Sequence, residues 1–336
     1  MRVLLAGGIT GGHAYPLAGA ASFLGDNTDF EVFWYGIPGK IEEKLAYELG
    51  CFFVPASFSR FDRRFWFSLT REVAKLKRLD VDVTLIAGAY LSIPAIFAAK
   101  SGSLWVYNAD PSLGLANKLG MWLGGRLISP FGNYLGADIA SDFSSYYFKR
   151  RFKPYLKIEK FLREDDKKVL IVGGSQGAEV LCRLAVDLKK FAPLVKFKIF
   201  LIAGKHFDKF VEFEDEELQI ADYIEGVSHY FGKFDCVISR AGAGTVFQLI
   251  DSAQPAILVP LATSRMGHQF RNAEMMGEGG VIIKEEEISK ISRVLESLMY
   301  IFSNRAIMME KLQAIRKELG VIPAKEGLNR WLAIIS

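Results

Sequence analysis

Residues 2–13 read RVLLAGGITGGH, and residues 168–178 read KVLIVGGSQGA. In each stretch an apolar segment typical of a buried strand runs into a glycine-rich turn that opens a helix. Glycine lets the backbone approach a ligand, and the helix start offers N–H groups and the positive end of a dipole. One such unit stands near the start of each half of the chain. The pair predicts two α/β domains that face a cleft.

Composition sets the broad class of protein. The 336 residues are enough for two α/β domains with full cores. Half of the residues are hydrophobic and 24% are charged, as in a soluble globular protein, and the net charge of +4 is too small to imply nucleic acid. The cysteines, Cys51, Cys182 and Cys236, lie far apart without metal or disulfide spacing, so a reducing cytosol is expected. The first 25 residues contain a glycine turn rather than a signal peptide, and no apolar run reaches the roughly 18 residues that span a bilayer.

Strand and helix patterns alternate along the chain, which predicts parallel sheets. Further strands are expected at 31–35, 52–54, 83–87, 104–107, 198–202, 236–238, 256–259 and 281–283. Helices are expected at 14–24, 40–49, 65–79, 92–99, 304–319 and 324–334. The charged stretch 149–168 is the expected join, so the domains are placed at 1–160 and 161–321, and a helix at about 322–336 could return to the first domain.

The glycine turns do not fit the common nucleotide motifs. Neither turn reads G-x-G-x-x-G with an acidic residue about 20 residues later, which argues against a dinucleotide enzyme. The chain also lacks G-x-x-x-x-G-K-[ST], which argues against a P-loop nucleotidase.

Two further segments of the second half point to an anionic, sugar-bearing ligand. Residues 239–245, SRAGAGT, follow a strand and open a helix, where small residues leave room for phosphate oxygens and Gln248 lies one turn inside. In residues 268–273, HQFRNA, Gln269 and Asn272 share one helix face, and paired amides suit sugar hydroxyls. The plain alternatives are a closely packed helix start and a polar surface helix.

Together these motifs resemble the MurG family of bacterial glycosyltransferases, the N-acetylglucosaminyltransferases that convert lipid I to lipid II. Residues 14–16 (AYP), 87–94 (AGAYLSIP) and 114–118 (GLANK) fit the same pattern in the same order, and the resemblance covers nearly the whole chain. It implies a GT-B fold, with two Rossmann-like domains across a cleft. It also implies that the second domain binds UDP-N-acetylglucosamine and that the first binds the undecaprenyl-linked acceptor at the cytoplasmic face of the membrane. The transfer would invert the sugar, without a cofactor and with no nucleic acid partner.

The chain departs from the family pattern at several positions. Gln248 replaces a glutamate, residues 107–110 read YNAD in place of histidine-glutamate-glutamine-asparagine, and Ile9 replaces the third glycine of the first turn. The family's glycine-asparagine-proline-valine-arginine segment is absent, with Lys153-Pro154 as a weak substitute. Two alternatives therefore stay open: a transferase for another UDP-sugar or lipid acceptor, and a nucleotide-sugar-binding relative with impaired catalysis.

The site residues follow from the motifs and the resemblance. His13 is the candidate general base, because a histidine at a helix start facing a cleft is kept neutral by the dipole, and Asp110 is the competing base. The alternative is that His13 only hydrogen-bonds the turn or holds the acceptor in place. No metal site is expected. The expected acceptor contacts are Tyr90, Asn108 and Asn117. The expected donor contacts are Thr10, Gly11, Gly12, Ser175, Gln176, Ile224, Gly242, Ala243, Gly244, Thr245, Gln248, Gln269 and Asn272.

A segment of interleaved aromatic and basic residues predicts the membrane-docking surface. Exposed aromatics beside arginines suit anionic lipid headgroups, whereas the plain alternative is core plus a solvated basic face. On the helix that follows, Phe65, Trp66, Leu69, Val73 and Leu76 fall in one arc and are expected in the core. The expected docking residues are Phe58, Arg60, Phe61, Arg63, Arg64 and Phe67.

Overall fold

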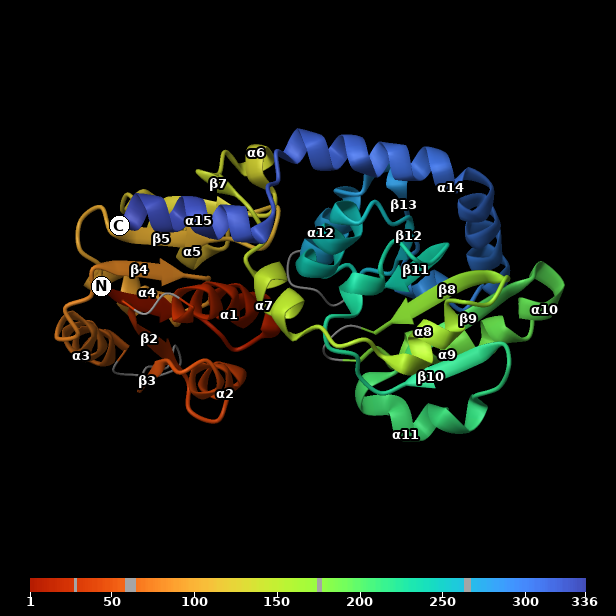
Figure 1. Ribbon diagram of the computed structural model, residues 1–336, viewed down its shortest axis with the longest axis horizontal. Coiled ribbons are helices and arrows are strands. Elements are labelled where there is room, and N and C mark those ends of the chain that lie inside the picture. Colours follow the sequence, from red (N-terminus) through yellow and green to blue (C-terminus); the bar gives the residue numbers. More distant parts are fainter. Residues whose placement is uncertain (27–28, 58–64, 174–176, 263–266) are drawn as a thin grey trace. The chain divides into compact units, whose positions relative to one another are not determined.

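The computed structural model describes residues 1–26, 29–57, 65–173, 177–262 and 267–336. The chain divides into two compact units, one formed by Met1–Arg150 with Leu319–Ser336 and the other by Arg151–Glu318 (Figure 1). In the described residues, each unit carries one parallel sheet with helices on both faces.

The first unit is built on a sheet of strand order β3-β2-β1-β4-β5-β6-β7, with every pairing parallel. Along β1, Val3 and Leu5 enter the core on one face, and Leu4 and Ala6 enter the core on the other. Burial on both faces explains why these strands read as continuous apolar runs. The strands are β1 (Arg2–Ala6), β2 (Glu31–Gly36), β3 (Phe52–Pro55), β4 (Val83–Ile86), β5 (Leu104–Tyr107), β6 (Arg126–Ser129) and β7 (Ile139–Ala140).

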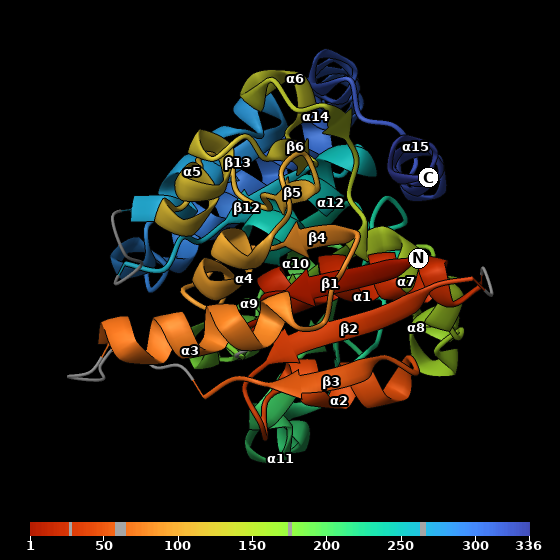
Figure 2. The same cartoon turned by 90° about the vertical axis from the view of Figure 1, so that its left-hand side faces the viewer.

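Helices cover both faces of this sheet. One face packs against α1, α2, α7 and α15, and the other against α3, α4 and α5, which Figure 2 shows beside one another. The helices are α1 (Gly11–Gly25), α2 (Ile41–Glu48), α3 (Phe65–Lys77), α4 (Ser92–Ala98), α5 (Leu115–Trp122), α6 (Gly132–Leu135), α7 (Ser144–Arg151) and α15 (Ala324–Ile335).

Helix α15 completes the core of the first unit although it follows the whole second unit in sequence. Leu328 and Trp331 are fully buried in that core, and the Trp331 ring lies 5.9 Å from the ring of Phe143. Gly327 permits this approach, because a Cβ there would lie 2.5 Å from the Cβ of Ser141.

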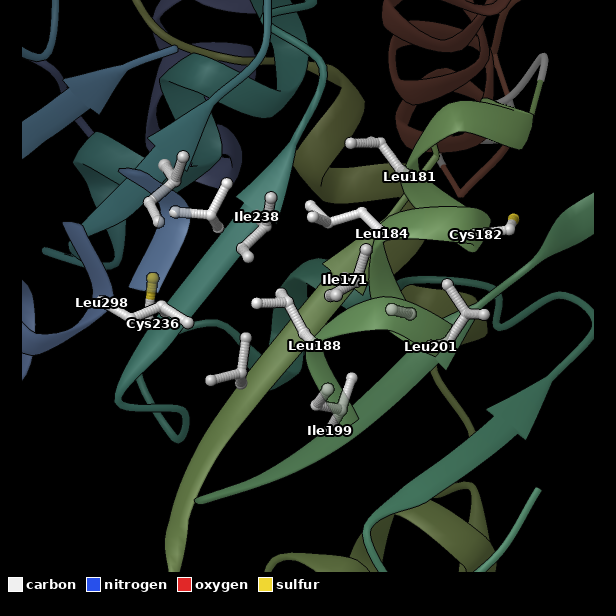
Figure 3. Packing of buried hydrophobic residues seen from close by; sticks show 14 of the residues in the cluster. Ile171, Leu181, Cys182, Leu184, Leu188, Ile199, Leu201, Cys236, Ile238 and Leu298 are labelled. Carbon is white, nitrogen blue, oxygen red and sulfur yellow. The ribbon is translucent and has the colours of Figure 1, made fainter. Parts of the chain in front are cut away.

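The second unit has strand order β10-β9-β8-β11-β12-β13, again with parallel pairings. Ile171, Ile199 and Ile238 point from its central strands into a core shared with Leu184 and Leu188 of α9 and Leu298 of α14 (Figure 3). The strands are β8 (Lys167–Val172), β9 (Phe197–Ile202), β10 (Leu218–Ala221), β11 (Cys236–Ser239), β12 (Ala256–Leu258) and β13 (Gly280–Ile282). The α-helices are α8 (Leu156–Phe161), α9 (Glu179–Lys189), α10 (Ala192–Val195), α11 (Phe207–Phe210), α12 (Ala243–Asp251), α13 (His268–Glu274) and α14 (Ile291–Leu319). The 3-10 turns are η1 (Gly204–His206), η2 (Val211–Phe213), η3 (Val227–Tyr230), η5 (Gly277–Gly279) and η6 (Glu285–Glu287).

The predicted Rossmann-like sheets are confirmed in both units. Strands β6, β7 and β10 were not predicted, and α14 begins at Ile291 rather than near residue 304. The facing cleft, and the roles of the two units in acceptor and donor binding, stay predictions.

Candidate functional site

The first glycine turn lies at the carboxyl end of β1, next to β4, where the strand order reverses. In open α/β sheets this switch point is the usual place for a ligand. Thr10 has extended backbone and precedes α1, so its carbonyl accepts the N–H groups of His13 and Ala14. The first N–H groups of an α-helix have no partner within the helix. No atom of the described residues lies within 4 Å of where a Cβ on Gly12 would be, so these residues leave the helix start accessible to an anion.

His13 stands at the inner end of this turn. Its Nδ1 lies 3.2 Å from Thr10 Oγ1, and its ring edge faces Gly88, where a Cβ would lie 3.3 Å from Nε2. Burial lowers the pKa of His13 below 6.5, although the charge of Asp110 acts in the opposite direction. The imidazole is therefore neutral near pH 7, the form that a general base requires.

Two buried asparagines shape the loop after β5 that carries Asp110. The Nδ2 of Asn117 donates to Asn108 Oδ1 at 2.8 Å and to Tyr107 O at 3.2 Å. The Nδ2 of Asn108 donates in turn to the carbonyls of Asp110 and Ser112. Asn108 thus braces the loop, and its predicted contact with the acceptor stays a prediction.

Asn117 keeps one polar atom for a further partner. Its side chain is only 4% exposed, and within the described residues its Oδ1 has no hydrogen-bond partner. A Cβ on Gly88 would lie 3.4 Å from this oxygen and 3.3 Å from His13 Nε2, so the oxygen and the imidazole flank the same glycine. Tyr90 follows on the loop after β4 and is half-buried. The structure therefore gathers the predicted base and acceptor residues around the ends of β1, β4 and β5.

The second unit places the start of α12 at the carboxyl end of β11, next to β8, its own switch point. Gly242 precedes α12 with extended backbone. Among the described residues, a Cβ on Gly244 would meet no atom within 4 Å, and a Cβ on Gly242 would meet only Thr245 Oγ1, at 3.9 Å. Gln248 lies half-buried one turn further. An open helix start with a hydroxyl fits the predicted diphosphate contact.

Helix α13 joins the loops around this helix start. Asn272 is 3% exposed, and its Nδ2 donates to Ala241 O at 3.0 Å. Gln269 Oε1 accepts the N–H of Leu261 at 2.9 Å. The two amides thus hold the loops after β11 and β12, a use that the sequence did not reveal.

A half-buried ion pair, which the sequence analysis did not predict, connects a third loop to the loops after β11 and β12. Arg240 donates to Glu285 at 2.8 Å and to Val259 O at 3.2 Å. Arg240 lowers the pKa of Glu285 by hydrogen bonding and charge, and this carboxylate also accepts the N–H of Ala262. Arg240 belongs to the SRAGAGT motif, but no feature of the sequence near Glu285 indicates that its carboxylate pairs with Arg240.

The remaining predicted donor residues fall into two groups. Ile224 is buried after β10, just before Gly226, whose φ is +69°. Ser175 and Gln176 lie outside the described residues.

Within the described part of the chain, no cluster of three or more histidine, cysteine or acidic side chains could hold a metal ion.

The predicted docking segment is described only from α3 onward. Phe58, Arg60, Phe61, Arg63 and Arg64 lie outside the described residues. Phe67 is 69% exposed, as expected, and Leu69 and Leu76 are buried.

The expectation that Trp66 is a core residue is wrong, because its side chain is 76% exposed. It belongs to the first turn of α3, which projects beyond the strands that the helix covers (Figure 2).

Helix α5 adds apolar surface that the sequence reading missed. Leu115 is 84% exposed and Trp122 is 81% exposed, on a helix that packs beside α4, where Phe97 is also exposed. Their spacing of seven residues puts Leu115 and Trp122 on one helix face, and this spacing could have predicted the apolar surface from the sequence. The exposed residues Trp66, Phe67, Phe97, Leu115 and Trp122 are called the α3–α5 apolar face below. Across the described part of the chain, no helix has the length and apolar character needed to cross a bilayer.

Comparisons with known proteins agree with this architecture. The profile of the glycosyltransferase family 28 C-terminal domain matches residues 168–320. The chain is 30% identical to the UDP-N-acetylglucosamine--N-acetylmuramyl-(pentapeptide) pyrophosphoryl-undecaprenol N-acetylglucosamine transferase of Thermosipho africanus, over 99% of both chains. It is 26% identical to the enzyme of the same name from Bacillus subtilis, over 98% of both chains.

Solved structures share the fold. The crystal structure of Acinetobacter baumannii MurG matches with a TM-score of 0.76 at 21% identity, over 99% of this chain and 98% of that one. The spinosyn rhamnosyltransferase SpnG matches with a TM-score of 0.68 at 15% identity, over 99% of this chain and 100% of that one. The predicted GT-B fold class is thereby confirmed.

Proposed function

We infer the function of this chain from its family: it belongs to the MurG family of UDP-N-acetylglucosamine-dependent N-acetylglucosaminyltransferases. It transfers N-acetylglucosamine from UDP-N-acetylglucosamine to lipid I, giving lipid II for peptidoglycan synthesis and hence for cell-wall growth and division. The observation that carries this function is the 30% identity to a named transferase over 99% of the chain. The test is incubation with UDP-N-acetylglucosamine and a lipid I analogue, scored for the disaccharide product.

His13 is the proposed general base. With Nδ1 next to Thr10, Nε2 is the nitrogen that takes the proton from the attacking sugar hydroxyl. The hydroxyl oxygen then bonds the anomeric carbon, the bond from that carbon to the diphosphate oxygen breaks, and UDP leaves with the electron pair. Attack opposite to the leaving group inverts the anomeric carbon and yields a β1,4 bond.

The start of α12 is the proposed site for the donor diphosphate. Negative charge grows on the diphosphate as UDP leaves, and unpaired N–H groups at a helix start stabilise such charge. The Thr245 hydroxyl adds one donor, and Gln248 is the proposed ribose contact. Gln269 is the proposed contact for the sugar hydroxyls.

A transferase for another UDP-sugar or lipid acceptor is the second candidate. It is favoured by Gln248, which accepts hydrogen bonds without the charge of a glutamate, and by Asn108, whose amide is used within its loop. Assays of UDP-glucose and UDP-N-acetylgalactosamine beside UDP-N-acetylglucosamine discriminate the two candidates.

The α3–α5 apolar face is the proposed membrane contact. Phe67 and Trp122 supply apolar surface, and the exposed Arg71 and Lys118 on the same helices attract anionic headgroups. The acceptor's polyprenyl chain stays in the bilayer, so the enzyme must come to it. The proposed location is the cytoplasmic face of the cell membrane, which the unpaired, buried cysteines support.

A further inference from the structure

Glu42 on α2 is a buried carboxylate that the proposed mechanism does not use. Its side chain is fully buried. Oε2 accepts the backbone N–H of Ile9 at 3.1 Å, and Oε1 accepts the backbone N–H of Ile37 at 3.1 Å. One carboxylate therefore ties the glycine turn after β1 to the loop after β2. Hydrogen bonds from N–H groups to a charged acceptor are about twice as strong as neutral ones.

Two glycines make room for this carboxylate. A Cβ on Gly8 would lie 2.5 Å from Glu42 Cδ, and a Cβ on Gly36 would overlap Glu42 Cγ. Each glycine belongs to one of the two segments that the carboxylate joins. The backbone on both sides is thus shaped around Glu42.

The turn needs such a hold because Ile9 is strained. Ile9 has φ +72°, the left-handed region, which costs an L-residue about 1–2 kcal/mol and suits a β-branched side chain least. The Ile9 N–H is the group that Glu42 binds. Ile9 precedes Thr10, whose Oγ1 lies 3.2 Å from His13 Nδ1. Glu42 is therefore linked through Ile9 and Thr10 to the imidazole.

We propose that Glu42 is a positioning residue, which holds the strained turn at Ile9 and so sets the orientation of His13. This proposal rests on the proposed function, in which His13 accepts the acceptor's proton. Glu42 itself contacts backbone rather than substrate, so its effect should fall on kcat more than on donor binding.

The first test is Glu42→Gln. An amide has one acceptor oxygen, so glutamine of nearly the same size can keep only one of the two N–H bonds. We expect kcat to fall by about tenfold or more, because small displacements of a catalytic group are costly, while the affinity for UDP stays within about twofold. Glu72→Gln is the matched control. Glu72 is also a buried carboxylate of the first unit, 2% exposed, but it accepts the Tyr35 hydroxyl at 2.8 Å, and its substitution should change kcat by about twofold at most.

The second test removes the strain. Glycine adopts a positive φ freely, so Ile9→Gly should leave kcat within about twofold and give a turn that no longer depends on the carboxylate. In the Ile9→Gly background, Glu42→Gln should cost about threefold or less in kcat. The double variant also covers the case in which Glu42→Gln alone fails to fold. The proposal is overturned if Glu42→Gln lowers kcat as much in the Ile9→Gly background as in the parent protein. It is also overturned if the Glu42→Gln variant folds and has the kcat of the parent.

Amide hydrogen exchange separates this proposal from the proposed function. The Ile9 and Ile37 N–H groups should be protected in the parent protein, and Glu42→Gln should speed the exchange of at least one of them by about tenfold, whereas Glu72→Gln should not. If the parent transfers no sugar yet exchange changes in this way, the proposed function fails and the hold on the turn stands. If the parent is active and the exchange of both groups is unaffected by Glu42→Gln, the positioning role fails.

Discussion

Replacing Asn272 with alanine tests whether α13 holds the loop after β11 in place. The Asn272 amide is 3% exposed and donates to the carbonyl of Ala241 at 3.0 Å. Alanine would leave that carbonyl unpaired in a buried place, which costs about 1–3 kcal/mol. A loss of 1 kcal/mol lowers the melting temperature of a domain of 150–250 residues by about 2–4 °C. The expected fall is therefore about 2–12 °C in the melting transition of the unit that contains residues 151–318.

The matched variant on the same helix, Gln269→Ala, should separate stability from donor binding. Gln269 accepts the N–H of Leu261, which is 37% exposed, so water can replace the lost acceptor and the melting temperature should change little. Loss of the proposed contact with the sugar should weaken UDP-N-acetylglucosamine binding by about 1–3 kcal/mol, which is roughly 5- to 150-fold.

Calorimetric melting and isothermal titration with UDP-N-acetylglucosamine measure both effects on the same preparations. If Asn272→Ala keeps the parent's melting temperature but loses as much donor affinity as Gln269→Ala, Asn272 is a direct ligand contact. The assignment of its amide to the Ala241 loop would then be refuted.

Other predictions address the base, the membrane and the returning helix. His13→Ala should lower kcat by about a hundredfold or more with UDP affinity unchanged, measured by steady-state kinetics and titration. Because burial lowers the pKa of His13 and Asp110 raises it, activity should be lost as pH falls through a value below 6.5, and Asp110→Asn should move that acid limb to lower pH. If Asp110→Asn lowers kcat by about a hundredfold and His13→Ala stays active, Asp110 is the base. Exchanging Phe67 and Trp122 for glutamate should release the protein from anionic vesicles in a sedimentation assay without changing its melting temperature, and equal binding would exclude the α3–α5 apolar face. Trp331→Ala should destabilise the first unit by about 3–5 kcal/mol in urea unfolding, whereas an unchanged midpoint would mean that α15 adds nothing to that core.

The sequence predicted the parts of the fold that local pattern encodes. Strands β1 (Arg2–Ala6) and β8 (Lys167–Val172) are buried on both faces. Such strands can be recognised in a sequence because their residues form a continuous apolar run. Strand β10 was missed because its four residues follow the acidic run 214–217, and β7 because it has only two residues. The helical periodicity wrongly predicted that Trp66 lies in the core. Periodicity shows which residues share a helix face, but not where the helix extends beyond the sheet that it covers.

The candidate site was predicted as a set of residues, but not as a set of contacts. Gln269 and Asn272 were chosen for their spacing, yet their partners Leu261 and Ala241 belong to loops whose proximity depends on the order of β11 and β12 in the sheet. The same holds for Glu42, which meets Ile9 only because β1 and β2 are neighbours. Such pairings are set by tertiary structure, and no short stretch of sequence carries them.

The return of α15 to the first unit has a consequence for synthesis. A nascent chain that has reached residue 318 holds every residue of the second unit, but its first unit still lacks Leu328 and Trp331, which fill the core beside Phe143. The core of the first unit can therefore close only after the whole second unit has been synthesised, although Met1–Arg150 come first along the chain. Until residues 319–336 have been added, the apolar side chains that pack against Leu328 and Trp331 have no helix to cover them.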